Sequence, residues 1–198
     1  MRIIAGSCRG MTLRTPRGDM TRPSSSKLRE AVMMLLMPWL EDSVFIDLFA
    51  GSGSVGLEAV SRCAREAIFV EKSKDALSCL KANLQACQMR CDADRQRPKV
   101  RMRLVSRDVS HSLQGQLCPD GTADIIWADP PYQDAVAWLK SPDTVRVLDL
   151  LKSGGCFAME YRSCDRDQIL LPCGGDENWE RLKDKQYGDT AVTIWSKN

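Results

Sequence analysis

From Val44 onward, short apolar runs alternate with segments whose apolar residues recur at helical spacing. The runs that predict buried strands are VFIDLF (44–49), AIFVE (67–71), VRMRLVSRD (100–108), ADIIWAD (123–129) and GCFAMEY (155–161). The segments that predict helices cover residues 54–64, 74–88, 134–140 and 145–152. Strands that alternate with helices in this way predict an α/β fold with a mainly parallel, doubly wound, Rossmann-like sheet.

Both ends of the chain depart from this alternation. Residues 2–15 contain two strand-like pieces around a glycine turn, which predicts a β-hairpin. A helix should follow from Ser26 to Met37 and end at Pro38, because proline lacks the N–H that helices need. Residues 181–187 and 190–196 predict a terminal hairpin around Gly188-Asp189. We therefore expect an N-terminal extension over residues 1–40 and a main α/β domain over residues 41–198.

Composition is that of an ordinary globular protein, with 198 residues of which 43% are hydrophobic. No apolar stretch approaches the roughly 20 residues of a membrane span, and the N-terminus lacks a secretory core, so we expect a cytoplasmic protein. The nine cysteines include no C-x-x-C pair, and Cys87 and Cys91 are spaced for adjacent helical turns. We expect reduced, mostly buried thiols and no metal site.

Charge is concentrated in two basic zones. Residues 1–30 carry seven basic side chains against two acidic ones, and residues 90–107 carry the same numbers. Because the whole chain has a net charge of only +2, the remainder is acidic. Basic zones on an acidic body suit a protein that binds a polyanion such as nucleic acid, although solvated surface would give the same pattern.

A glycine-rich turn follows the first predicted strand. Within DLFAGSGSVGLE (47–58), Gly51, Gly53 and Gly56 satisfy G-x-G-x-x-G, and Glu71 ends the next strand. Alone, the motif suits a dinucleotide or another adenosine-bearing cofactor. Asp47 favours S-adenosylmethionine, because a carboxylate at the strand end can meet a cationic amino acid group rather than a pyrophosphate. Asp108, which ends the third strand, could reach an adenine amine or cap the following helix.

A second unusual turn, DPPY (129–132), ends the strand ADIIWA. The Asp129 side chain and the Pro130 carbonyl can each accept an N–H from an exocyclic amine of a nucleobase. Pro131 stiffens the turn, and Tyr132 can stack on the base. Although D-P-P also opens ordinary loops, its combination with the upstream cofactor motif favours an enzyme that methylates such an amine by positioning and charge stabilisation.

Together these motifs resemble the bacterial guanine-N2 methyltransferases that act on 16S ribosomal RNA. The likeness rests on DLFAGSGSVGLEAVSR, FVEK, ADPPY and KQYGDT, and more specifically on RIIAG, RGMTL and TRPSSSKLREAVMMLL at the N-terminus. Two departures lie in the N-terminal helix, where Ser26 and Lys27 replace the family's usual Asp and Arg. A third is Cys63, which stands where the family usually has glycine.

The resemblance implies a class I S-adenosylmethionine-dependent methyltransferase that modifies one guanosine in the helix 31 loop of the small subunit or an assembly intermediate. Nothing in the sequence demands more than a monomer, which is the state we expect. It assigns the cofactor to Asp47, Phe49, Gly51, Gly53, Glu71, Asp108 and Asp129. It assigns the target base to Asp129, Pro130, Pro131 and Tyr132. It assigns RNA contacts to Arg2, Arg9, Arg14, Arg22, Lys27 and Arg29.

Alternatives of two classes stay open at this point. A DNA or RNA adenine-N6 methyltransferase would use the same chemistry, although DNA enzymes normally carry a larger recognition region. A non-catalytic ribosome-assembly factor could retain the fold, but the intact glycine loop and DPPY turn argue against it. An NAD-dependent oxidoreductase is disfavoured because no proton donor such as a Tyr-x-x-x-Lys pair is evident.

Overall fold

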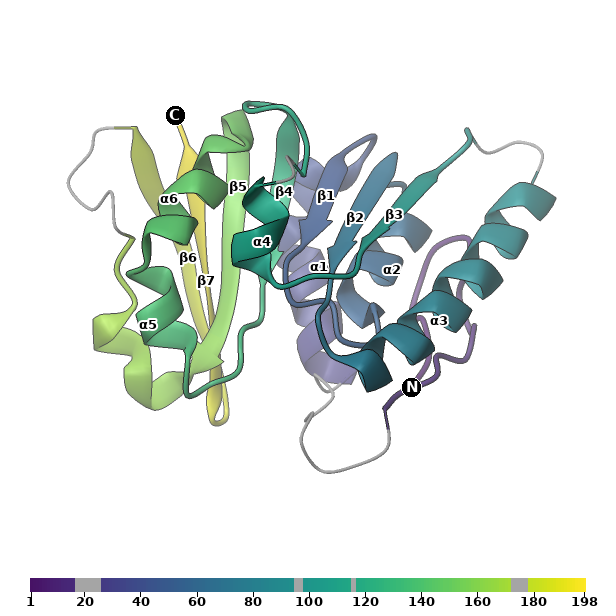
Figure 1. The fold of residues 1–198 in the computed structure, drawn as a ribbon, viewed down its shortest axis with the longest axis horizontal. Coiled ribbons are helices and arrows are strands. Elements are labelled where there is room, and N and C mark those ends of the chain that lie inside the picture. The colour runs from purple at the N-terminus through teal and green to yellow at the C-terminus, as the bar shows by residue number, and fades with distance from the viewer. Residues whose placement is uncertain (17–25, 95–97, 115–116, 172–177) are drawn as a thin grey trace.

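The computed structural model describes residues 1–16, 26–94, 98–114, 117–171 and 178–198, and it confirms the α/β class (Figure 1). Its seven-stranded sheet has the order β3-β2-β1-β4-β5-β7-β6, in which only β7 runs against its neighbours. The strands are β1 (Val44–Asp47), β2 (Glu66–Val70), β3 (Arg101–Val105), β4 (Ala123–Ala128), β5 (Leu151–Arg162), β6 (Trp179–Tyr187) and β7 (Thr190–Lys197).

Helices cover both faces of the sheet. One face carries α1 (Ser26–Leu40), α2 (Ser54–Ser61) and α3 (Lys74–Ala93), and the other carries α4 (Val109–Gln114), α5 (Ala135–Leu139) and α6 (Pro142–Asp149). In Figure 1 the helices α4, α5 and α6 lie in front of the sheet, with α1 and α2 behind it. A 3-10 helix, η1 (Ser163–Gln168), follows β5. Two buried faces explain why the central strands are continuous apolar runs.

The predicted N-terminal hairpin is reduced to one antiparallel bridge, Arg2 with Thr12, and residues 1–16 contain no regular strand. Helix α2 explains the difference. The Glu58 carboxylate accepts hydrogen bonds from the backbone N–H groups of Ile4 at 2.8 Å and Ala5 at 3.0 Å. The first limb of the expected hairpin therefore binds a helix side chain instead of completing a strand ladder.

Helix α1 passes through Pro38 and ends at Leu40, so the prediction of an end at Met37 was wrong. A proline in the last turn removes only one backbone hydrogen bond. Leu36 and Leu40 are buried on either side of it, at 0% and 3% exposure. Their packing against the sheet keeps the final turn helical.

The junction between α6 and β5 also differs from the prediction. Helix α6 ends at Asp149, and Leu151 already pairs with Ala123 of β4, so residues 151 and 152 are not helical. The predicted turn before residue 155 lies within β5 as an irregularity, where Gly154 has φ 77°. Burial of Leu151 against β4 explains why the strand begins early.

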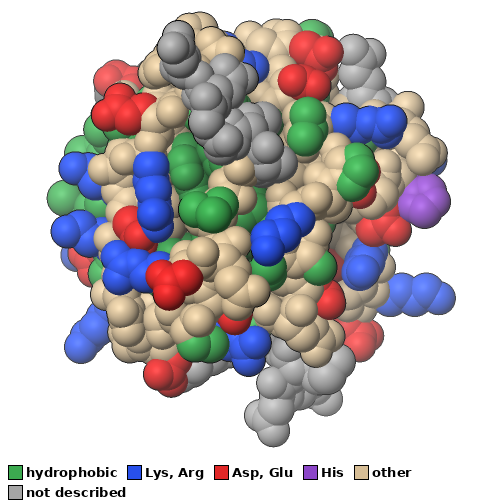
Figure 2. All heavy atoms as spheres, turned by 90° about the vertical axis from the view of Figure 1, so that its left-hand side faces the viewer, with side chains coloured by type: hydrophobic (Ala, Val, Ile, Leu, Met, Phe, Trp, Pro, Cys, Tyr) green, Lys and Arg blue, Asp and Glu red, His purple; other side chains and the backbone are tan. Residues whose placement is uncertain are grey.

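Strand β6 forms an edge of the sheet and carries alternating charges at Glu180, Arg181, Lys183, Asp184 and Lys185. Figure 2 faces this side of the molecule and shows Lys and Arg side chains interspersed with Asp and Glu. Charges on an edge strand oppose its pairing with a strand of another molecule. Among the described residues, none of the helices combines the length and apolar character needed to cross a bilayer.

Candidate active site

The predicted functional turns meet at the carboxyl ends of β1 and β4, two neighbouring parallel strands. Asp47 is the last residue of β1 and pairs with Trp127, two residues before Asp129. From this point the chain winds outward in both directions along the sheet, which makes it the topological switch point. Ligands of doubly wound sheets bind in the crevice beyond such strand ends. The fold therefore brings the glycine loop and the DPPY turn to one edge.

The glycine loop is shaped by backbone geometry. Gly51 and Gly53 have φ 54° and 80°, values that glycine adopts without strain. At Gly56 a side chain is excluded, because an added Cβ would lie 2.4 Å from the Phe69 ring. The Gly56 N–H donates to Asp47 Oδ2 at 3.0 Å. Each glycine of the motif thus serves a turn or a close approach between helix and strand.

Asp47 is a buried carboxyl group, at 1% exposure. Burial raises its pKa from 3.8 to about 7; the hydrogen bond from Gly56 lowers the pKa, and the nearby Glu71 charge raises it further. A pKa near neutrality leaves Asp47 only partly ionised at pH 7. A cationic ligand group beside it would favour the ionised form, which agrees with the predicted role at the amino acid end of a cofactor.

Glu71 connects the end of β2 to the glycine loop. Its Oε2 accepts from the Gly51 N–H at 2.7 Å, and its Oε1 accepts from the N–H groups of Lys72 at 2.8 Å and Ser73 at 2.7 Å. The carboxylate therefore holds the shape of the loop. The predicted contact with ribose hydroxyls stays a prediction, since carboxylate oxygens can accept further hydrogen bonds.

Asp129 joins a second group of acidic side chains. Burial raises the pKa of Asp129 well above its usual range, and the charges of Glu160 and Asp47 raise it further. Glu160 is 3% exposed and lies on β5 directly after Met159, which pairs with Ala128. Three carboxyl groups from three strands thus converge here, and a cation would relieve their mutual repulsion.

Side chains of β5 and β7 anchor the DPPY turn. The Tyr132 hydroxyl lies 2.9 Å from Thr190 Oγ1 and donates to Glu160 Oε1 at 3.3 Å. The Pro131 carbonyl accepts from the Asp134 N–H at 2.8 Å, which starts the turn into α5. Pro130 is buried and Pro131 exposed. These bonds fix the turn, while stacking of the Tyr132 ring on a base stays a prediction.

Two further predicted cofactor residues, Phe49 and Asp108, follow β1 and β3. Phe49 is half-buried, with its ring edge-to-face against Trp138 at 5.2 Å between centroids. Asp108 caps α4, since its Oδ1 accepts from the His111 N–H at 2.8 Å and lies 2.8 Å from His111 Nδ1. These bonds lower the pKa of Asp108. Of the two roles predicted for Asp108, the structure confirms the cap of α4. The contact with an adenine amine stays a prediction.

The predicted RNA-contacting residues have different surroundings. Arg2, Arg9, Arg14 and Lys27 are exposed, whereas Arg22 lies outside the described residues. Arg29 is fully buried: it donates to the Arg2 carbonyl at 2.7 Å and lies 3.7 Å from Glu58. Its placement among the RNA contacts was therefore wrong, because the guanidinium is enclosed by the protein.

The two basic zones adjoin, which the sequence could not indicate. Arg90 of α3, from the second zone, donates to the Arg9 carbonyl of the first zone at 3.3 Å. Arg101 and Arg103 of β3 are exposed farther along the second zone. The two basic zones thus meet at Arg9 and Arg90.

Asn83 of α3 is a functional candidate that sequence reasoning missed. Its side chain accepts from the Arg14 N–H at 2.8 Å and donates to the Arg14 carbonyl at 2.9 Å. It also donates to the carbonyl of Ser52 in the glycine loop at 2.8 Å. Asn83 therefore joins the basic N-terminal segment to the cofactor loop. Only its polar character at a buried helical position could have indicated this.

Known proteins resemble this chain over nearly its whole length. The family described as conserved hypothetical protein 95 matches residues 1–196. Ribosomal RNA small subunit methyltransferase D of Haemophilus influenzae is 31% identical over 198 residues, covering 98% of this chain and 93% of that protein. The protein YlbH of Bacillus subtilis, provisionally described as an rRNA methyltransferase, is 30% identical and covers 100% of this chain and 99% of its own length.

A solved structure agrees with these sequence relatives. An Escherichia coli protein, yhhF, provisionally described as a methyltransferase, superposes with a TM-score of 0.75 at 26% identity. The superposition covers 100% of this chain and 97% of that chain. The N-terminal segment and the site at the edge of the sheet are therefore both within the shared structure.

Proposed function

This chain belongs to the family of conserved hypothetical protein 95 and ribosomal RNA small subunit methyltransferase D, and we propose that it transfers a methyl group from S-adenosylmethionine to N2 of one guanosine in 16S ribosomal RNA. Family membership supports S-adenosylmethionine-dependent methylation of ribosomal RNA. The choice of N2 of guanine rests on the motif resemblance. The observation that carries the proposal is the convergence of Asp47, Asp129 and Glu160 beside the glycine loop.

The described residues fit a cationic, adenosine-bearing methyl donor. S-adenosylmethionine carries a positive sulfonium and a positive amino group, and it supplies an activated methyl group when bound. Asp47 would hold the amino acid end, with Gly51 and Gly53 permitting close approach and Glu71 keeping the loop in shape. Burial and the nearby Glu71 charge raise the pKa of Asp47, and a positive ligand group beside it would lower that pKa again.

Asp129 and Pro130 would orient the target amine. An exocyclic amine is a poor nucleophile because its lone pair is delocalised into the ring. Its N–H groups can donate to the Asp129 carboxylate and the Pro130 carbonyl, which favours pyramidal nitrogen. Methyl transfer breaks one sulfur–carbon bond and forms one nitrogen–carbon bond, and the nitrogen loses one proton. The Asp129 carboxylate could accept that proton, because a positive group beside it would favour its ionised form.

Tyr132 and the basic surface would bind the RNA. The hydroxyl contacts of Tyr132 with Thr190 and Glu160 hold its ring next to Asp129. Arg2, Arg9, Arg14 and Lys27 are exposed and can contact phosphates of ribosomal RNA, either in a small subunit or in an assembly intermediate. Adenine N6 presents a similar amine, so an adenine-N6 enzyme is the alternative that the same turn would serve.

The test is transfer of labelled methyl from S-adenosylmethionine to small subunits from a strain that lacks the modification, followed by nucleoside analysis. We expect label in N2-methylguanosine at a single position of 16S ribosomal RNA. Label in N6-methyladenosine would retain the chemistry but overturn the base specificity. Absence of label with the cofactor bound would overturn the proposed substrate.

A further inference from the structure

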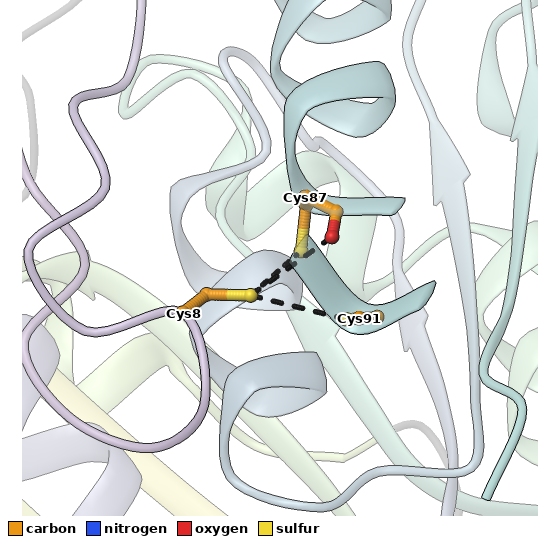
Figure 3. Close-up of side chains that lie close together, drawn as sticks. All are labelled: Cys8, Cys87 and Cys91. Atoms are coloured by element: carbon orange, nitrogen blue, oxygen red, sulfur yellow. Dashed lines mark hydrogen bonds between the residues drawn. The ribbon is translucent and has the colours of Figure 1, made fainter. Parts of the chain in front are cut away.

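Three buried cysteines meet where the N-terminal segment lies against α3 (Figure 3). Cys8 belongs to that segment, whereas Cys87 and Cys91 lie one turn apart on the helix. Their exposures are 0%, 0% and 5%. Cys8 Sγ lies 3.5 Å from Cys87 Sγ and 3.8 Å from Cys91 Sγ, and all three sulfur atoms lie within 4.8 Å of one another.

These separations suit three corners of a metal-thiolate tetrahedron. Zinc–sulfur bonds of about 2.3 Å place the corners of a tetrahedron roughly 3.8 Å apart. A disulfide would instead need a sulfur–sulfur distance of about 2.05 Å, far shorter than either separation here. Figure 3 shows the Cys8 side chain directed toward both helix cysteines, with dashed contacts running from Cys8 to each.

We propose that Cys8, Cys87 and Cys91 form a structural zinc site. Zinc binding would convert three thiols to thiolates, release three protons to solvent and form three zinc–sulfur bonds, with a water molecule as the fourth ligand. The resulting complex carries one negative charge. The Arg90 guanidinium donates to the Arg9 carbonyl, one residue from Cys8, so one positive charge lies near the site.

The site would fix the basic N-terminal segment to the helix that supports the cofactor loop. Cys8 lies between the exposed residues Arg2 and Arg14, and α3 also binds Arg14 and Ser52 through Asn83. Zinc would thus strengthen a junction that apolar packing and hydrogen bonds already form. The cluster was not predictable from the sequence, because Cys8 and Cys87 are 79 residues apart and form no C-x-x-C pair.

The test is the zinc content of the full chain after loading with zinc chloride under a phosphine reductant and removal of excess metal. We expect one zinc ion per chain in the unaltered protein and its loss in the Cys8→Ser and Cys87→Ser variants. Cys79→Ser is the matched control, because Cys79 lies on the same helix outside the cluster, and this variant should keep the ion.

Cobalt(II) absorption and thermal unfolding of proteins that keep all three cysteines test the proposal even if the Cys8 and Cys87 variants fold poorly. Cobalt(II) should give a strong sulfur-to-metal charge-transfer absorption with the unaltered protein and with Cys79→Ser. Zinc should raise the Tm of both, since a ligand of the folded state stabilises it. An unaltered, reduced protein that binds no zinc would overturn the proposal, as would zinc binding that survives loss of Cys8 or Cys87.

Discussion

At the residue scale, Cys63 occupies a backbone conformation that suits a different residue. It follows the end of α2 with φ 80°, a left-handed value that strains any residue with a Cβ. The related family usually has glycine here, and glycine is the preferred residue just beyond a helix C-terminus. The departure noted in the sequence is therefore a local cost to stability.

Cys63→Gly should raise the free energy of unfolding by about 0.5–1 kcal/mol, because relief of the left-handed strain exceeds the added chain entropy. Urea unfolding measures the change. Cys164→Gly is the control: Cys164 is also exposed but lies in η1 without a positive φ, so its replacement should not stabilise. A stability gain at both positions would contradict the backbone argument.

Arg29 illustrates how a charge can be misread from sequence. A basic residue on a helix near other basic residues suggests an RNA contact, and only the fold reveals that Arg29 faces Glu58, 3.7 Å away, with both side chains fully buried. No local pattern contains that information, because the two residues belong to different helices.

Arg29→Ala should therefore destabilise the protein by about 3 kcal/mol, since it leaves a buried carboxylate with less compensation. Arg9→Ala should leave stability unchanged but weaken RNA binding and reduce its salt slope by about one. Urea unfolding and RNA titrations at several salt concentrations measure both variants. Arg29→Ala with normal stability and weakened RNA binding would restore the original assignment.

At the element scale, the alternation of strand and helix was predictable because burial on both faces of the sheet determines the apolar pattern. The end of α1 and the start of β5 were not, because tertiary packing of Leu40 and Leu151 prevailed over the local proline and glycine signals. The site was predictable as two strand-end turns. The position of Glu160 beside Asp129 was not, since it depends on which strands are neighbours.

Helix α3 should couple the N-terminal segment to the cofactor loop through Asn83. Asn83→Ala leaves the Arg14 N–H and the Ser52 carbonyl without these bonds, which should cost about 2 kcal/mol of stability. Loosening of the loop should weaken S-adenosylmethionine binding about tenfold, equivalent to about 1.4 kcal/mol. Calorimetric titration measures the binding.

Gln88→Ala is the control on the same helix, because the half-buried Gln88 side chain donates to Asp92 and makes no hydrogen bond to the loop among the described residues. It should change neither stability nor cofactor affinity appreciably. Equal affinities for the Asn83 and Gln88 variants would mean that Asn83 does not support the loop.

At the scale of the whole molecule, the carboxyl groups at the edge of the sheet link folding stability to pH. The pKa of Asp47 is about 7 in the folded protein and ordinarily 3.8. The folded state therefore retains a proton that the unfolded chain releases, so the free energy of unfolding falls as pH rises from about 4 to about 7. The carboxyl group proposed to contact a cationic ligand therefore lowers the stability of the folded protein at neutral pH.

Asp47→Asn should remove the contribution of Asp47 to this dependence and, near pH 8 without cofactor, stabilise the protein by up to roughly 4 kcal/mol, while weakening S-adenosylmethionine binding. Urea unfolding near pH 5 and near pH 8 measures the difference. The exposed residue Asp120 supplies the control Asp120→Asn, which should keep the unaltered profile. Parallel profiles for the Asp47 variant and the unaltered protein would contradict the assigned pKa.

We infer that Asp129 orients the target amine and is not needed to hold the cofactor. The most direct measurement compares calorimetric S-adenosylmethionine binding with methyl transfer to unmodified small subunits for Asp129→Ala and Asp129→Asn, with Asp134→Asn, an exposed position beyond the turn, as control. We predict binding within a few fold of normal and transfer reduced roughly a hundred- to thousandfold in both Asp129 variants. Retained transfer, or loss of binding in parallel with transfer, would contradict the account.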